Sequence, residues 1–232
     1  MKDLFERLFG KIFRQRTLGM IYVDLLRLKA RWRMRLKTTP ATSARLHLGC
    51  GRRRVDGWLN VDLRGSDFDV DLACGRLPWK DESFEVVVSQ HVIDELEIER
   101  ELVPLLKELN RILKPGGELW LSTQDMEKIC RSYLQDGGAA LIADVKTRIP
   151  AFDMKGFPDS HFMNEIFYDS GRNMNEFDLP LLTHVLGMAG FDRCRRVNER
   201  DLLERFPGFP PRRDDDPSLY ICAAKTDAPA KH

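Results

Sequence analysis

The chain has 232 residues, of which 43% are hydrophobic and 31% charged, and its formal net charge is +1. This length and composition fit one large globular domain with appendages, and they exclude a disordered, collagen-like or fibrous chain. The near balance of 37 basic and 36 acidic residues also argues against the global basic field of a dedicated nucleic-acid-binding protein.

The first 40 residues form a basic segment, with eleven basic and three acidic residues and hence a charge of +8. Six large apolar residues recur there at the spacing of one helical face; they are Leu4, Phe5, Leu8, Phe9, Ile12 and Phe13. A second helical stretch runs from Leu18 to about Leu36 and ends before the Pro40 breaker. The sequence therefore predicts a basic amphipathic helical arm, residues 1–40, ahead of a domain at residues 41–226.

Three roles fit residues 1–38 of this arm. It could lie on an anionic membrane surface, pack on the domain or on a second copy in a homodimer, or grip nucleic-acid phosphates. The apolar face suits lipid or protein better than phosphates. We therefore do not expect nucleic acid as a partner, and the membrane and packing roles stay open.

From residue 45 the pattern alternates short apolar runs with helical periodicity. We expect strands at Arg45–Leu48, Trp58–Asp62, Glu85–Ser89, Glu118–Ser122, Arg193–Val197 and Leu219–Ala224. We expect helices at Glu97–Leu113 and Leu179–Met188. Strands that alternate with helices predict an α/β fold whose mostly parallel sheet is covered by helices on both faces.

Residues 130–178 show no clean period and carry Gly137-Gly138 and several aromatic residues. Such a segment fits a lid-like insertion over a site, or an ordinary long surface excursion. The tail at residues 227–232 is small and polar, so we expect it to be frayed.

The cysteines and the apolar runs bear on location. The five cysteines are scattered and form no C-x-x-C pair, which argues against a disulfide framework and a structural zinc site. No run approaches the roughly 18 uninterrupted apolar residues of a membrane-spanning helix. Asp3 and Glu6 stand where a secretory leader would be basic. We expect a cytoplasmic protein without a metal, with attachment to the inner face of a membrane left open.

Two motifs at the ends of predicted strands suggest a ligand crevice. Leu48-Gly49-Cys50-Gly51 runs a strand into a glycine turn, where backbone can approach a ligand closely. Asp62 ends the next strand, where a carboxylate can accept both hydroxyls of a ribose. Each motif alone also fits a plain turn or a turn cap.

Two further motifs follow along the chain. Asp71-Leu72 offers a carboxylate and an apolar wall for a ring with an exocyclic amine. The run from Val86 to Val88 predicts a buried strand that ends in polar residues at Gln90 and His91. All four motifs would meet at one edge of the sheet.

In this order, with Lys114-Pro115-Gly116-Gly117 behind them, the motifs resemble the class I S-adenosylmethionine-dependent methyltransferases. The nearest group is the methyltransferase-11-like type that carries L-H-L-G-C-G, then G-W-L-N-V-D. The resemblance covers about residues 45–125 and extends more loosely to 224. It implies a Rossmann-like sheet of seven strands with an antiparallel last strand, and S-adenosylmethionine as cofactor.

The resemblance also implies roles for individual residues. Gly49, Cys50 and Gly51 would line the methionine part of the cofactor, Asp62 would hold the ribose, Asp71 and Leu72 the adenine, and Gln90 or its neighbours the amino-acid end. His47 stands where the common family pattern has an acid, two residues before the first glycine, and we include it among the cofactor-binding residues. The third glycine of that pattern falls on Arg53.

His91 is the candidate catalytic base, because its expected place faces the methyl group and an imidazole suits proton transfer near neutral pH. A histidine that satisfies backbone groups at a helix start is the plainer alternative. The sequence predicts methyl transfer to a small-molecule or glycan- or lipid-linked acceptor. The alternative is a catalytically silent subunit that binds the cofactor or a partner; a nicotinamide dehydrogenase is disfavoured because Arg54 occupies its third glycine position.

Overall fold

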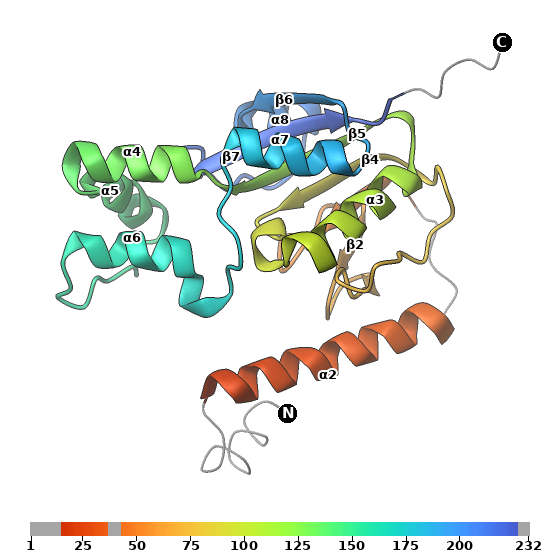
Figure 1. Ribbon diagram of the computed structural model, residues 1–232, viewed down its shortest axis with the longest axis horizontal. Helices are drawn as coiled ribbons and strands as arrows, with labels where there is room; N and C mark the ends of the chain where they lie inside the picture. Colours follow the sequence, from red (N-terminus) through yellow and green to blue (C-terminus); the bar gives the residue numbers. More distant parts are fainter. Residues whose placement is uncertain (1–14, 37–42, 227–232) are drawn as a thin grey trace.

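The buried apolar runs of the chain assemble into one seven-stranded sheet (Figure 1). The computed structural model describes residues 15–36 and 43–226. The strands lie in the order β3-β2-β1-β4-β5-β7-β6, and their bounds are β1 Arg45–Leu48, β2 Leu59–Asp62, β3 Phe68–Asp69, β4 Phe84–Gln90, β5 Leu113–Gln124, β6 Arg193–Val197 and β7 Ser218–Ala224. Strand β7 runs antiparallel to both its neighbours, and the pairs among β1 to β5 are parallel. The predicted fold class, antiparallel last strand included, is confirmed.

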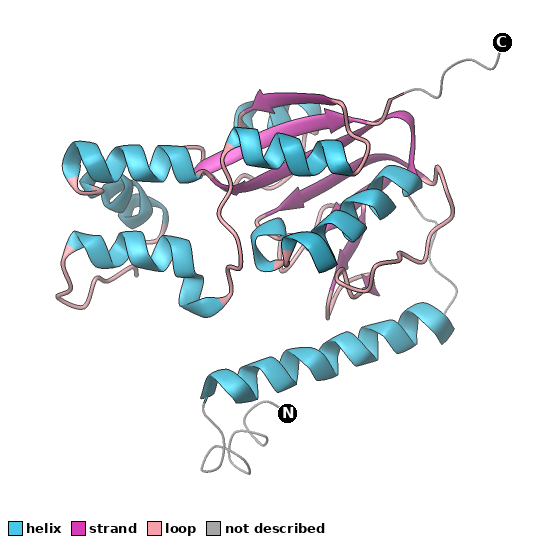
Figure 2. Cartoon of the chain, in the orientation of Figure 1, coloured by secondary structure: helices cyan, strands magenta, loops and turns pink. Residues whose placement is uncertain are grey.

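Helices cover both faces of this sheet (Figure 2). Their bounds are α2 Gln15–Leu36, α3 Val103–Ile112, α4 Met126–Asp136, α5 Ala139–Arg148, α6 Asp159–Tyr168, α7 Leu179–Met188 and α8 Glu199–Arg205. Helices α3 and α7 pack on the face that includes Val87. Helix α8 packs on the opposite face, with Val86 and Val88, because successive side chains of a strand point to opposite sides. This double cover explains why β4 is apolar on both faces.

The structure corrects several predicted bounds. Strands β4 and β5 are longer than expected, and β3, with only two residues, was not predicted. The predicted helix Glu97–Leu113 is a π-helical turn, Ile98–Leu102, followed by α3. Helix α3 ends at Ile112, one residue before the predicted end, because buried Leu113 already pairs with Phe84 in the sheet.

The segment at residues 130–178 contains regular structure that its sequence period did not reveal. Helices α4, α5 and α6 enclose a small core of their own, with Ile129, Leu141, Ile142, Phe162 and Met163 buried. Gly137 and Gly138 both adopt positive φ, which ends α4 and turns the chain directly into α5. The aromatic residues of this segment thus serve mainly a local core.

Helix α2 is the described part of the predicted arm, and it packs on the domain through one face. Leu18 and Ala30 are buried, and Met34 packs against the main core. Packing on the domain, one of the three roles considered, therefore holds for residues 15–36. The apolar face predicted between Leu4 and Phe13 lies outside the described residues. No helix in the described part of the chain is both long and apolar enough to cross a bilayer.

Leu106 tests the packing of α3 on the sheet. Its side chain is fully buried in the main core, so Leu106→Ala should lower the free energy of unfolding by about 2–5 kcal/mol through lost contacts and a cavity. The neighbouring Lys107 is exposed, and Lys107→Ala should change the free energy of unfolding by less than about 0.5 kcal/mol. Urea denaturation followed by circular dichroism measures both. Equal losses in the two variants would contradict the packing described.

Candidate functional site

The carboxyl ends of the four strands β3, β2, β1 and β4 lie side by side. In the parallel register Leu48 pairs with Val61 on one side and with Ser89 on the other, and Asp62 pairs with Asp69. The residues that follow these positions must therefore emerge at the same edge. The structure brings Gly49, Asp62, Asp71 and Gln90 together there, as the sequence predicts.

The glycine turn is tied directly to the end of β2. The Gly51 backbone N–H donates to Asp62 Oδ2 at 2.8 Å, and the Leu63 N–H donates to Asp62 Oδ1 at 2.6 Å. The Asp62 side chain remains partly exposed, so its oxygens can still accept from a ligand. Cys50 is buried, and burial raises the pKa of its thiol to about 11. This cysteine is thus a neutral packing residue within the turn.

Gly49 is required by both conformation and space. Its φ is +67°, and a Cβ at this position would lie 2.2 Å from Val92 Cγ2. Val92 follows the end of β4, so the loops after β1 and β4 are in close contact at this point. The two loops form one wall of the crevice.

His47 lies in the interior of the domain. Its Nδ1 is 3.3 Å from Asn60 Oδ1, and its ring centroid is 4.8 Å from that of Phe209. Burial lowers the pKa of His47 to about 4, so the imidazole is neutral at physiological pH. A neutral, enclosed ring favours a structural role for His47, which supports Asn60 beneath the glycine turn.

Asp71 is paired with the N-terminal helix. Its buried carboxylate accepts from Arg31 Nε at 2.5 Å and from the Ala73 N–H at 3.1 Å, and Arg27 Nε lies 3.9 Å away. Asp69 also forms an ion pair with Arg33. Helix α2 therefore closes the β2–β3 side of the crevice, the side at which an adenine contact is predicted. Leu72 is half-buried against the main core.

A row of polar side chains crosses the sheet at the ends of β4, β5 and β7. Gln90 pairs with Ser122, which pairs with Tyr220, so the three side chains share one face. Both amide atoms of Gln90 and the Ser122 Oγ are buried, and no described residue forms a hydrogen bond with them. Buried polar groups without a partner are costly, so this row fits a site that binds a polar ligand.

His91, directly after β4, belongs to a hydrogen-bonded cluster with the loop before β7. Its Nε2 lies 3.0 Å from Asp214 Oδ2 and 3.2 Å from Ser218 Oγ. Asp214 also accepts from Tyr220 Oη at 2.5 Å and from Arg212 Nε at 2.8 Å. Burial alone would raise the pKa of Asp214, but the hydrogen bonds from His91, Tyr220 and Arg212 hold that pKa well below its usual range.

Two more acids lie close to this cluster. Asp94 is buried beside Thr123, with Oγ1 donating at 3.4 Å to Asp94 Oδ1, and burial raises the pKa of Asp94. Burial and the neighbouring Asp94 raise the pKa of Glu176 to about 8. Glu176 therefore carries a proton at neutral pH, which limits the negative charge on this side of the crevice.

One protein-family model matches part of the chain. Residues 58–121, from just before β2 into β5, match the family model described as "Methyltransferase domain". The sheet order and the converging strand ends fit the same assignment. This stretch of the chain therefore matches a methyltransferase family model, and it lies within a Rossmann-like sheet.

Solved structures similar to this chain have low sequence identity to it. An S-adenosylmethionine-dependent methyltransferase from Methanosarcina mazei is 19% identical, with 79% of this chain and 92% of that chain covered and a TM-score of 0.47. A second S-adenosylmethionine-dependent methyltransferase, from Thermotoga maritima, is 17% identical, with 97% of this chain and 100% of that chain covered and a TM-score of 0.46. A Haemonchus contortus N-methyltransferase, solved with S-adenosylhomocysteine, is 14% identical, with 86% and 52% covered and a TM-score of 0.44. No curated protein matches the sequence.

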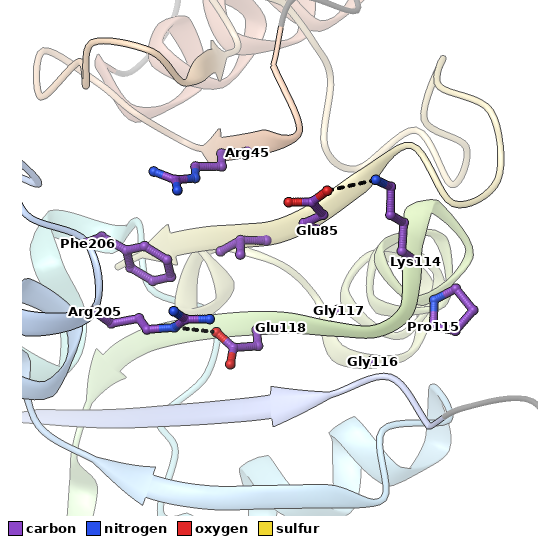
Figure 3. Close-up of a pocket in the computed structure, with 10 residues that line it drawn as sticks. Arg45, Glu85, Lys114, Pro115, Gly116, Gly117, Glu118, Arg205 and Phe206 are labelled. Atoms are coloured by element: carbon purple, nitrogen blue, oxygen red, sulfur yellow. Dashed lines mark hydrogen bonds and ion pairs between the residues drawn. The ribbon is translucent and has the colours of Figure 1, made fainter.

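The domain also has a cavity of about 240 Å³ at the opposite end of the sheet (Figure 3). It lies at the amino end of β4 and the start of β5, and ion pairs cross it: Lys114 with Glu85 at 2.8 Å, and Arg205 with Glu118 at 3.3 Å. None of the predicted site residues lines it. Four of its five charged groups form these ion pairs, and the fifth, Arg45, lies over the Trp58 ring, which favours a role in stability.

Sequence reasoning missed Arg31 of the N-terminal arm and Arg212 and Asp214 of the domain. Asp214 stands in the run Arg212-Arg213-Asp214-Asp215-Asp216, which is typical of a solvated loop. Only its burial and its contact with His91 distinguish it from the neighbouring acids. Arg31 is one of many basic residues in the arm, and its partner lies 40 residues away in the sequence.

Gly49 and Gly51 form a matched pair for testing the crevice wall. Both have positive φ, so alanine at either position should cost about 1–2 kcal/mol of stability. Only at Gly49 does the new Cβ meet Val92; at Gly51 it meets nothing within 4 Å. The free energy of unfolding, measured by urea denaturation, should therefore fall by about 1–3 kcal/mol more in Gly49→Ala than in Gly51→Ala, because the new methyl group overpacks against Val92. Equal losses would show that Val92 is not held against the turn.

Proposed function

We propose that the chain transfers a methyl group from S-adenosylmethionine to a small-molecule or glycan- or lipid-linked acceptor. The observation that carries this proposal is the crevice in which the glycine turn is hydrogen-bonded to Asp62 at 2.8 Å, beside the unpartnered polar atoms of Gln90 and Ser122. A polar ligand with a ribose and an amino-acid end fits these groups. The bound cofactor supplies an activated methyl group on a sulfonium.

The residues of the chain have the tasks of holding and orienting the reactants. The turn at Gly49, Cys50 and Gly51 offers close backbone approach, Asp62 accepts ribose hydroxyls, and Gln90 binds the amino-acid end. Asp71 and Leu72 lie at the adenine side, where α2 adds Arg31 to the wall. Positioning an acceptor in line with a methyl group can lower the barrier by about 7–11 kcal/mol.

Asp62→Ala tests the assignment of the crevice. Loss of hydrogen bonds to a charged group should weaken the binding of S-adenosylmethionine by about 1.5–3 kcal/mol, or about 10–150-fold in Kd. Asp56 is exposed in the loop before β2, and the Asp56→Ala variant should bind S-adenosylmethionine normally. Isothermal titration calorimetry with S-adenosylmethionine and with S-adenosylhomocysteine measures both variants. Unchanged affinity in Asp62→Ala would argue against the ribose role.

The same titration, followed by a methyl-transfer assay, separates an active enzyme from a catalytically silent subunit. An enzyme should bind the cofactor and also transfer a labelled methyl group to acceptors from a broad panel. Binding without transfer to any acceptor would favour the catalytically silent subunit.

We infer that α2 also attaches the protein to an anionic membrane through its outward face. Leu25, Leu28, Trp32 and Leu36 recur at helical spacing and are 50%, 55%, 67% and 75% exposed. Exposed Lys29 and Arg35 lie on the same helix. An apolar stripe with cationic neighbours suits the headgroup region, where each basic residue adds about 1 kcal/mol.

Vesicle sedimentation tests this surface. Leu28→Glu with Trp32→Glu should reduce binding to vesicles containing phosphatidylserine, whereas Leu134→Glu, at a residue 84% exposed on α4, should leave it unchanged. Vesicles of neutral lipid should bind the wild-type chain weakly. Equal binding by all three proteins would contradict the proposal. A dimer in light scattering that the α2 double variant abolishes would assign the stripe to a second copy instead.

A further inference from the structure

We propose that His91 and Asp214 form a proton-accepting pair and that the acceptor atom of the substrate is a hydroxyl oxygen. The inference rests on the proposed methyl transfer and narrows its substrate class. Its first support is geometric, since the imidazole of His91 meets a buried carboxylate from a segment 123 positions later in the sequence.

The contact determines which ring nitrogen is free. Asp214 is ionised, and its Oδ2 lies 3.0 Å from His91 Nε2, so Nε2 carries the hydrogen and Nδ1 presents a lone pair. No described residue forms a hydrogen bond with Nδ1. The His91 side chain is 17% exposed, which leaves the ring partly accessible. An imidazole in this tautomer can accept a proton at Nδ1.

Asp214 is itself held in place on both oxygens. Tyr220 donates to Oδ1, and Arg212 and His91 approach Oδ2. Arg53, two residues after Gly51, donates to the Pro210 carbonyl at 2.6 Å, which ties the loop of Asp214 to the glycine turn. A carboxylate fixed in this way can orient a histidine.

His91 is also fixed through its backbone. Its φ is +52°, in the left-handed region that a non-glycine residue seldom occupies. Its N–H donates to the Ser122 carbonyl at 2.8 Å, and the next residue, Val92, packs against Gly49. Strained backbone of this kind is concentrated at functional sites. These contacts place the histidine at the crevice wall, beside the row formed by Gln90 and Ser122.

The chemistry of the acceptor explains why such a base is needed. A neutral amine attacks through a lone pair that it already has, whereas a hydroxyl becomes a good nucleophile only as it loses its proton. The acceptor oxygen bonds to the methyl carbon while the carbon–sulfur bond breaks with its electrons remaining on sulfur, and the hydroxyl proton passes to His91 Nδ1. The resulting imidazolium is stabilised by Asp214.

The tautomer can be measured without an acceptor. Long-range proton–nitrogen NMR spectra of the full chain should show the His91 hydrogen on Nε2 in the wild type. The His91 signals are assigned as those that disappear in the His91→Gln variant. Asp214→Asn should disturb this tautomer, while Asp216→Asn, at an exposed acid two residues away, should not. Hydrogen on Nδ1 in the wild type, or identical spectra in all three proteins, would overturn the pair.

The substrate class can be tested with matched acceptors. The probes are alcohols and amines on the same skeletons, such as phenol with aniline and a hexose with its amino sugar, given with tritiated S-adenosylmethionine. Transfer to hydroxyl members should fall about 10²–10⁴-fold in His91→Gln and in Asp214→Asn, and stay normal in Asp216→Asn. Transfer to amines alone, or transfer that survives His91→Gln, would overturn the hydroxyl assignment.

The division of the effect between kcat and KM separates positioning from mere structural support. Asp214→Asn should lower kcat on hydroxyl acceptors while leaving KM nearly unchanged, because the acceptor still binds but its proton has no oriented base. A rise in KM with kcat unchanged would contradict the positioning role. Failure of the proposed function would look different, because calorimetry would then show no cofactor binding by the wild type.

Discussion

The hydrogen bond from the Gly51 N–H to the Asp62 carboxylate is the interaction on which the site depends. It joins the turn after β1 to the end of β2, and it exists because parallel neighbours bring their carboxyl ends to one edge. Gly49 adds the second link, since without a Cβ it lets Val92 reach the turn from the end of β4. Three strand ends are thus locked into one wall, and the remaining polar groups take their positions from it.

Charged pairs then close the two sides of this wall. On the β2–β3 side, Arg31 and Arg33 of α2 pair with Asp71 and Asp69. On the β4–β7 side, Asp214 contacts three side chains, Arg212, Tyr220 and His91, through hydrogen bonds and ion pairs. The carboxylates of Asp71, Asp69 and Asp214 are buried, so removal of one partner would leave an uncompensated charge, which is costly in a protein interior. Helix α2 and the loop before β7 therefore form part of the walls of the crevice.

The sequence predicted the sheet and the crevice well because both rest on local patterns. An apolar run that ends in glycine or aspartate, as at Leu48-Gly49 and Val61-Asp62, shows a strand and its polar end within a few residues. The two-residue β3 carries too little pattern to recognise, and the helices at residues 126–168 bury a small core of their own whose period is broken by Gly137 and Gly138. Long-range ion pairs leave no local signal: Arg31 and Asp71 are 40 positions apart. Asp214 differs from Asp216 by its burial and its contact with His91, and neither can be read from the local sequence. For the same reason His47, which the sequence placed at the cofactor, is a core histidine in the structure.

The arrangement of these parts limits how an acceptor can approach. Helix α2 occupies the β2–β3 side, and α4 begins directly after β5 at the same edge of the sheet, with α5 and α6 packed on it (Figure 1). His91 directly follows β4, which lies between β1 and β5 in the sheet. The proposed proton transfer to His91 therefore places the acceptor over the middle of this edge rather than at either end of the sheet.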